Sequence, residues 1–236
     1  MLYTQPENKV QVDPYWVKYL LLTHPVQLIT TIGRVRGKLE TNVAPFATCL
    51  DTSYNPPYVT IAAFIHQHTP AGEEPIRGKM NTYLNIRQNG LFIVNTPGRA
   101  LLDKLDILAY PYKRGQAKDK IEKAGLTKAT PFVFPENHLY YPPIIQECLA
   151  HIECKMIDIR RPKSSDHYLI TGRVVSASYT KSLGKSVEQV RNNLVKNVFH
   201  HYGQSGKNKR YVAFLVPKKI TTLTLQLEHV GEKKQY

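Results

Sequence analysis

The chain has 236 residues, enough for one large domain or two small ones with a substantial hydrophobic core. Hydrophobic residues make up 42% and charged residues 21%, as in ordinary soluble globular proteins, but the net charge is +14 and the pI is near 9.6. A cationic surface attracts nucleic acid, acidic lipid and phosphate-bearing cofactors alike, so the charge alone favours none of these partners over the others.

Short apolar runs rich in Val, Ile, Thr and Tyr alternate with turn residues along the whole chain. Such runs, bounded by Gly, Pro, Asn or Asp, are typical of strands. The predicted strands are 26–33, 43–51, 58–65, 91–96, 150–159, 167–179 and 221–227. Their connections are short and do not alternate regularly with helices, which favours an antiparallel sheet or barrel over a parallel doubly wound sheet.

Helical patterns are few, and they predict helical decorations on a mainly β fold. The predicted helices are 81–89, 99–109, 117–124 and 186–202. Gly90 ends the first of them, and the last has capping-box spacing between Ser186 and Gln189 and is followed by Gly203. We find no repeat and no long linker, so we expect a single domain over residues 1–236.

The three cysteines are spaced too irregularly for a disulfide framework or a zinc site, which favours a reducing, cytoplasmic compartment. Residues 1–16 lack a basic segment followed by an apolar one, so we expect no secretory signal. The apolar runs are too short to cross a bilayer, so we expect no membrane partner.

The stretch "RGKMNTYLNIRQNGLFIVN", residues 77–95, combines cations with the start of a predicted helix. The N-terminus of a helix exposes unpaired N–H groups and a positive partial charge, which suit a phosphate. Lys79 precedes this helix, Thr82 offers a hydroxyl in its first turn, and Arg87 follows about one turn later. An ordinary solvated helix explains the same segment, so both interpretations stay open on these residues alone.

A second candidate feature is the stretch around "TNVAPFATCLD". We expect a turn at 42–45 that leads into the small residues Ala47 and Thr48, where a flat ligand could approach the backbone closely. The residues Asn55-Pro56-Pro57 then turn the chain into the next strand. A plain strand–turn–strand unit is the alternative.

Eight segments in order carry a resemblance to a known family. "HPVQLITTIG", "TNVAPFAT", "NPPYV", "GKMNTYLNI", "LFIVNT", "AKDKIEKAGLT", "PPIIQECLAHIEC" and "DHYLITGRVV" resemble the signatures of the flavin reductase-like, FMN-binding split-barrel family. The match covers residues 24–178, whereas the segment 180–236 matches poorly. The resemblance implies a six-stranded antiparallel Greek-key barrel that forms a homodimer, with FMN near the subunit interface.

The resemblance also implies a set of flavin-binding residues. Asn42 and the residues after it would line the isoalloxazine ring, and Lys79, Asn81 and Thr82 would hold the phosphate. His167 matches a family position that would face the nicotinamide or the partner subunit, and a purely structural role is the alternative. The implied cofactor-binding residues are Thr30, Thr31, Asn42, Ala44, Pro45, Phe46, Ala47, Thr48, Cys49, Lys79, Asn81, Thr82, Asn85 and Arg87.

Two positions depart from the family pattern, and one loop is longer. Ala47 stands where the family more often has Ser, so Thr48 would have to replace that hydroxyl. Asn81 stands where the family has Asp, which removes a repulsive charge beside a phosphate. The loop at 66–78 is lengthened and could cover the pocket.

The function implied by the resemblance is that of a flavin reductase. It would pass a hydride from NADH or NADPH through FMN to free flavin or another small acceptor. The alternatives are a flavoredoxin-like electron carrier that serves a redox protein, and a basic nucleic-acid-binding barrel, against which the ordered motifs argue. We see no Ser/His/Asp triad and no paired carboxylates, and the pairs His66/His68 and His200/His201 lack further ligands for a metal. The basic tract 203–219 suits nucleic acid or a lid over a nucleotide phosphate.

Overall fold

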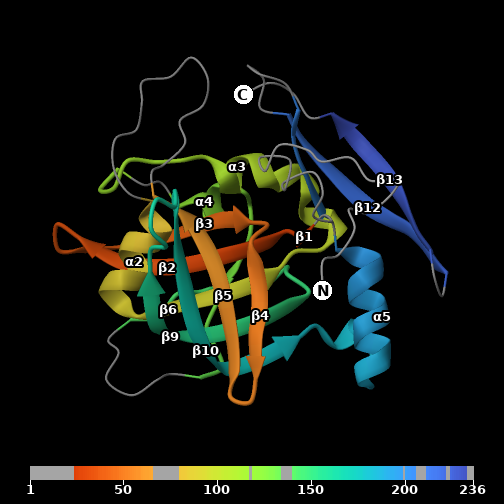
Figure 1. Ribbon diagram of the computed structural model, residues 1–236, viewed down its shortest axis with the longest axis horizontal. Helices are drawn as coiled ribbons and strands as arrows, with labels where there is room; N and C mark the ends of the chain where they lie inside the picture. Colours follow the sequence, from red (N-terminus) through yellow and green to blue (C-terminus); the bar gives the residue numbers. More distant parts are fainter. Residues whose placement is uncertain are drawn as a thin grey trace, which may run out of the picture.

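The centre of the fold is one rolled antiparallel sheet. The computed structural model describes residues 24–65, 80–116, 119–133, 140–198, 200–205, 211–221 and 224–232. The sheet has the order β3-β2-β6-β9-β10-β5-β4, and each neighbouring pair is antiparallel (Figure 1). Its strands are β2 (Gln27–Val35), β3 (Lys38–Phe46), β4 (Cys49–Tyr54), β5 (Pro57–Phe64), β6 (Leu91–Thr96), β9 (Ala150–Arg160) and β10 (His167–Tyr179).

A two-residue link forces this sheet to roll. The edge strand β3 ends at Phe46, and β4, at the opposite edge, begins at Cys49. Three Cα–Cα steps span at most about 11 Å, whereas the edges of a flat seven-stranded sheet would lie about 29 Å apart. The sheet must therefore curl until its edges meet at Ala47 and Thr48. This unclosed roll confirms the predicted mainly β split barrel.

The link corrects two expectations about this region. The predicted strand 43–51 is two strands, because the chain leaves its partner β2 after Phe46 and joins β5 at Cys49. The expected turn at 42–45 is wrong, since these residues pair with Leu28–Thr31 inside β3. Pro45 fits there because β3 is an edge strand, where a missing N–H is tolerated.

Strand β2 is buried on both faces and separates two apolar clusters. Ile29 faces the barrel interior, where it packs with Phe92, Ile170 and other buried residues. Leu28 faces the opposite side and packs in a second cluster with Leu105 and others. The elements that supply this second cluster are η2 (Arg99–Lys104), α3 (Leu105–Ala109), α4 (Lys120–Lys123) and β8 (Ile144–Ile145), which pairs with β7 (Lys128–Ala129). The predicted helix 99–109 is thus a 3₁₀ turn followed by a short α-helix.

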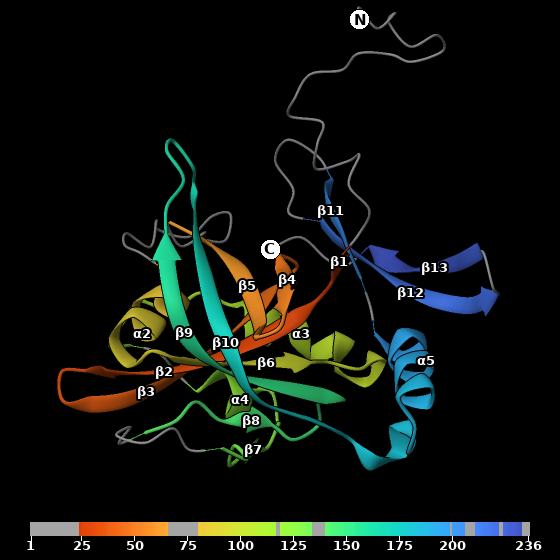
Figure 2. The ribbon, with the colours of Figure 1, turned by 60° about the horizontal axis from the view of Figure 1, so that its bottom comes forward.

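Helix α2 (Asn81–Asn89) matches its predicted range and packs against β2 (Figure 2). Gly90 ends it in the left-handed conformation with φ 74°, which glycine adopts without a steric penalty. Tyr83 and Ile86 extend from the helix into the interior cluster. The first turn of α2 is therefore held at one end of the barrel.

The C-terminal segment forms a second, smaller sheet and a helix. α5 (Val187–Asn197) has the predicted capping box, in which Gln189 N–H donates to Ser186 Oγ and Ser186 N–H to Gln189 Oε1. The helix ends before the predicted 202, because the chain becomes extended at Val198 and enters a strand that pairs with β1. The sheet order is β1 (His24–Pro25), β11 (His200–Ser205), β12 (Tyr211–Thr221) and β13 (Thr224–Glu232). Figures 1 and 2 both place α5, β12 and β13 on the side of the barrel away from α2.

Close approach of α2 to β2 requires a glycine at position 33. A Cβ atom there would lie 2.3 Å from Asn85 Oδ1 and 2.9 Å from Gln88 Oε1. Gly33→Ala should therefore lower the free energy of unfolding by about 1–3 kcal/mol, the usual cost of overpacking. Urea denaturation would measure this, with Lys38→Ala on the exposed start of β3 as a control expected to change stability by less than about 0.5 kcal/mol.

The clash can be identified with a second substitution. In a chain that also carries Asn85→Ala, the cost of Gly33→Ala should shrink, because the clashing amide is gone. Equal costs of Gly33→Ala with and without Asn85 would contradict the packing argument.

Candidate functional site

The first turn of α2 and strand β3 bring two predicted site residues together. Asn42 Nδ2 donates to Thr82 Oγ1 at 3.0 Å, and both side chains are buried. Because the Thr82 hydroxyl accepts this bond, its own hydrogen is left to donate to another group. Met80, the N-cap residue of α2, has no capping side chain, and the first turn carries no acidic residue. This end of α2 therefore offers donors and a positive partial charge.

Asn81 adds a buried acceptor with no partner. Its Nδ2 donates to the carbonyl of Tyr112 at 2.8 Å, whereas its Oδ1 is buried and bonds to nothing in the described part of the chain. An unpaired buried acceptor is costly, so it calls for a donor from outside these residues. An amide oxygen suits a hydroxyl donor rather than a phosphate oxygen, which itself accepts.

Asn85 serves the packing of α2 instead. Its Nδ2 donates to Thr31 Oγ1 at 3.2 Å, and its Oδ1 accepts from Arg114 Nη1 at 2.6 Å. Arg114 also donates to Gln88 and is half-buried, and this burial lowers its pKa. Arg87, two residues further along α2, is exposed, whereas Asn85 is buried. Sequence reasoning missed Arg114, because its partners lie 26 and 29 residues away.

The two predicted threonines of β2 point to opposite faces, as successive strand residues do. Thr31 faces α2, whereas Thr30 donates to the Pro143 carbonyl and accepts from Asn95 Nδ2. Asn95 Oδ1 lies 3.0 Å from His151 Nδ1, and burial lowers the pKa of His151 to about 4. A neutral His151 therefore donates to Asn95 and helps to lock Thr30 in place. No pattern in the sequence predicted that Asn95 and His151, 56 residues apart, would pair.

The link between the two sheet edges holds the remaining residues predicted to line the ring. Phe46 is buried in the interior cluster, and Ala44, Pro45 and Ala47 are half-buried. Burial raises the pKa of the adjacent Cys49 thiol to about 12, so this residue is a protonated packing group at neutral pH. The backbone around Ala47 is thus lined by small or inert side chains.

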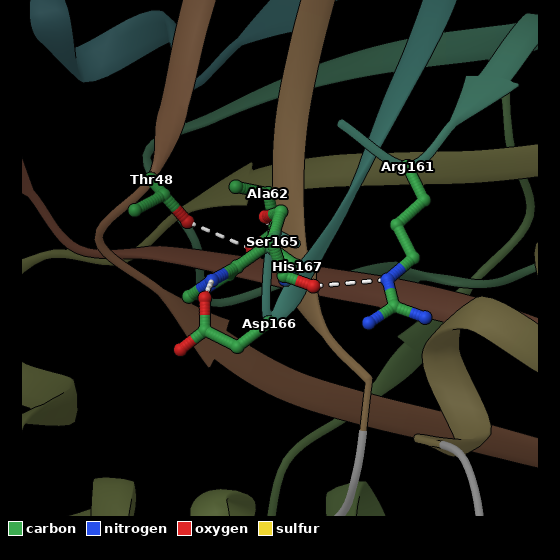
Figure 3. Close-up of polar contacts among 6 residues, drawn as sticks. All are labelled: Thr48, Ala62, Arg161, Ser165, Asp166 and His167. Carbon is green, nitrogen blue, oxygen red and sulfur yellow. Dashed lines mark hydrogen bonds and ion pairs between the residues drawn. The ribbon is translucent and has the colours of Figure 1, made fainter. Parts of the chain in front are cut away.

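Thr48 and His167 lie on either side of β5. Thr48 Oγ1 donates to the carbonyl of Ala62 at 2.9 Å (Figure 3). Phe64, two residues after Ala62, pairs with His167 of β10. Across β5, Thr48 and His167 are separated by two strand spacings, or roughly 10 Å. The His167 ring lies 3.9 Å from the Phe64 ring, and its Nδ1 lies 2.6 Å from Asp166 Oδ1. His167 is therefore held in one orientation beside the link.

Other predicted groups cannot be placed. Lys79, the loop 66–78 and the His66/His68 pair lie outside the described residues. Within the ranges that are described, no three His, Cys, Asp or Glu side chains come together as metal ligands. In the same ranges, no helix combines the length and the apolarity that a membrane span requires.

These observations define the class of the protein, which is a mainly β split barrel with a polar helix end. The family described as flavin reductase like domain matches residues 19–194, well over half of the chain, so this protein belongs to the flavin reductase-like family.

Solved structures similar to this chain share the fold. 2-Nitrobenzoate 2-nitroreductase of Pseudomonas fluorescens has a TM-score of 0.63 and 17% identity, covering 95% of this chain and 96% of that one. Nitrilotriacetate monooxygenase component B of Bacillus cereus has a TM-score of 0.60 and 19% identity, covering 100% and 98%. An NADH:FAD oxidoreductase of Streptomyces globisporus has a TM-score of 0.52 and 17% identity, covering 75% and 90%.

A buried lysine makes the stability of the protein depend on pH. Lys120, the first residue of α4, is only 6% exposed, and burial lowers its pKa from 10.5 to about 7. Between those values the unfolded chain binds a proton that the folded chain does not, so stability should rise with pH, at a slope approaching about 1.4 kcal/mol per pH unit. Lys120→Met should remove this slope and stabilise the protein at pH 7.

Urea denaturation at several values between pH 7 and 8 would check this, because unfolded thiols, whose pKa is about 8.5, ionise increasingly above that range. Lys123→Met, on the exposed side of α4, is the matched control. A parallel pair of pH–stability curves for the wild type and Lys120→Met would contradict the prediction.

Proposed function

We propose that the protein binds FMN and oxidises NADH or NADPH, passing the electrons to free flavin or another small acceptor. Membership of the flavin reductase-like family supports the flavin, and the fold shared with an NADH:FAD oxidoreductase supports the nicotinamide. The observation that carries the proposal is the first turn of α2, where the donor of Thr82 and the unpaired acceptor of Asn81 lie side by side in sequence and are both buried.

The phosphate and ribityl groups of FMN fit this helix end. The Thr82 hydroxyl, the uncapped N–H groups of α2 and Lys79 would donate to the phosphate. Asn81 Oδ1 would accept a hydrogen bond from a ribityl hydroxyl. The family has Asp at this position, and an amide oxygen can accept the same bond as a carboxylate oxygen. Asn42 donates to the Thr82 oxygen, so the hydrogen of the hydroxyl is left to donate to the phosphate.

The isoalloxazine ring fits the link between the sheet edges. Small side chains at Ala44 and Ala47 would let the ring approach the backbone, whose N–H groups would donate to its pyrimidine edge. When bound, FMN supplies the hydride chemistry, and the protein supplies orientation and access. His167, held by Asp166 and Phe64, would then border the space for the nicotinamide.

A homodimer is part of the same proposal. Leu50 and Tyr54 are 51% and 85% exposed on the edge strand β4. Large apolar side chains on an exposed sheet edge are consistent with a covering second subunit.

Anaerobic reduction tests the proposed activity. The purified protein, loaded with FMN, should lose its visible flavin absorbance when NADH or NADPH is added, and loading with FAD would show which flavin it prefers. A yellow protein that neither nucleotide bleaches would instead point to an electron carrier. A protein that retains neither flavin would refute the proposal.

Substitution of Thr82 tests the phosphate site. Thr82→Val keeps the shape and removes the hydroxyl, so FMN should bind about 10- to 100-fold more weakly, as expected for a lost bond to a charged group. Riboflavin, which lacks the phosphate, should lose much less, and Lys79→Ala should show the same selectivity. Fluorescence titration measures both affinities.

Two controls make the Thr82 result specific. Thr82→Ser should restore FMN binding, and Thr127→Val, at an exposed position between α4 and β7, should leave it unchanged. Equal losses for FMN and riboflavin would show that Thr82 does not contact the phosphate.

A further inference from the structure

The turn between β9 and β10 carries a cluster of cations. Arg160, Arg161 and Lys163 are all exposed within four residues, and none of them forms an ion pair within the described ranges. The nearby carboxylates are Asp158 on β9 and Asp166, of which Asp166 is already paired with His167. Unpaired cations on a short turn often belong to a solvated surface, so the charge by itself identifies no ligand.

Arg161 differs from a solvated cation because the turn holds it in place. Its Nε donates to the carbonyl of Ser165 at 2.9 Å, and Ser165 Oγ accepts from the N–H of His167 at 3.0 Å (Figure 3). Arg161, Ser165 and His167 therefore belong to one hydrogen-bonded turn. The bond uses only Nε–H, so both terminal nitrogens of the guanidinium keep their hydrogens for a ligand.

The ligand chemistry follows from this arrangement. A planar guanidinium fork binds phosphate oxygens through two parallel bonds and keeps its charge at any physiological pH. His167, on the same turn, forms a tilted aromatic pair with Phe64, with ring centroids 3.9 Å apart. A turn that carries both a cationic fork and an aromatic ring pair suits a molecule with an aromatic ring and a phosphate.

We propose that Arg161 binds the pyrophosphate of the nicotinamide dinucleotide whose nicotinamide ring lies beside His167, so that the β9–β10 turn selects the hydride donor. This inference rests on the proposed oxidation of NADH or NADPH. Arg160 and Lys163 add long-range attraction for the same anion. In the proposed function the FMN phosphate binds at the first turn of α2, so the two phosphate groups would occupy separate sites.

Two hydride donors separate this role from a structural one. NADH carries the pyrophosphate, whereas 1-benzyl-1,4-dihydronicotinamide carries the same reactive ring without any phosphate. With FMN-loaded protein, Arg161→Gln should raise the KM for NADH by about tenfold or more, as expected for a lost charge-assisted bond. The change in kcat should be small, and the loss should be confined to the phosphate-bearing donor. The KM of the wild type should also rise with salt more steeply than that of the variant.

Matched variants complete the test. Arg173→Gln, an exposed cation further along β10 where it pairs with Tyr58, should leave the KM for NADH unchanged. Arg161→Lys should recover only part of the affinity, because an ammonium lacks the fork. FMN affinity and the thermal unfolding temperature of Arg161→Gln should equal those of the wild type.

Two results would overturn the inference while leaving the proposed function intact. One is an unchanged KM for NADH in Arg161→Gln, and the other is an equal loss with both donors. A wild-type protein that oxidises neither donor would instead overturn the proposed function, and the inference with it.

Discussion

Ala47 and Thr48 carry the chain from one edge of a seven-stranded sheet to the other, and the rest of the structure follows from that short link. The link makes the sheet roll, which creates the interior where Ile29, Phe92 and Ile170 pack. It also leaves the roll unclosed at one place, since β3 and β4 meet there without forming a ladder with each other. The proposed ring-binding backbone lies at this split, where N–H groups are not all used by neighbouring strands.

Helix α2 depends on the same roll for its position. It packs against β2 through Gly33, which leaves space for Asn85, and through the bonds of Asn85 to Thr31 and Arg114. This polar contact holds the helix end near β3, so that Asn42 can fix Thr82. Buried polar networks of this kind are stabilising only when every member is satisfied. Asn81 Oδ1, in the first turn of the same helix, is a buried acceptor without a partner in the described residues, and the proposed ligand would supply one.

The sequence predicted those helices and strands whose ends are marked by glycine or turn residues next to them. Residues 81–89 were a predictable helix because Gly90 favours a left-handed end, and 91–96 and 167–179 were predictable strands because turn residues bound them. The region 43–51 was not predictable, because both halves have strand composition and only their partners differ. The end of α5 was misplaced for a similar reason, since pairing of residues 200 and 201 with β1 overrides a continuing helical pattern.

The residues of the candidate site also fall into two groups, those that the sequence could predict and those that it could not. Thr82 and Asn81 could be named in advance because a helix start and the family's signature mark them. Arg114, Asn95, His151 and Arg161 carried no such signal, since their importance comes from bonds to particular atoms of other segments.

The sequence by itself determined the β-rich character of the chain, the helix that begins at Asn81 and the family to which the chain belongs, because composition, periodicity and ordered motifs are local properties. Only the tertiary structure decided which threonine of β2 faces α2, which acceptor stays unpaired and which arginine bonds within the turn that also holds His167. These depend on strand register and on contacts between residues far apart in the chain, and they are set when the sheet rolls.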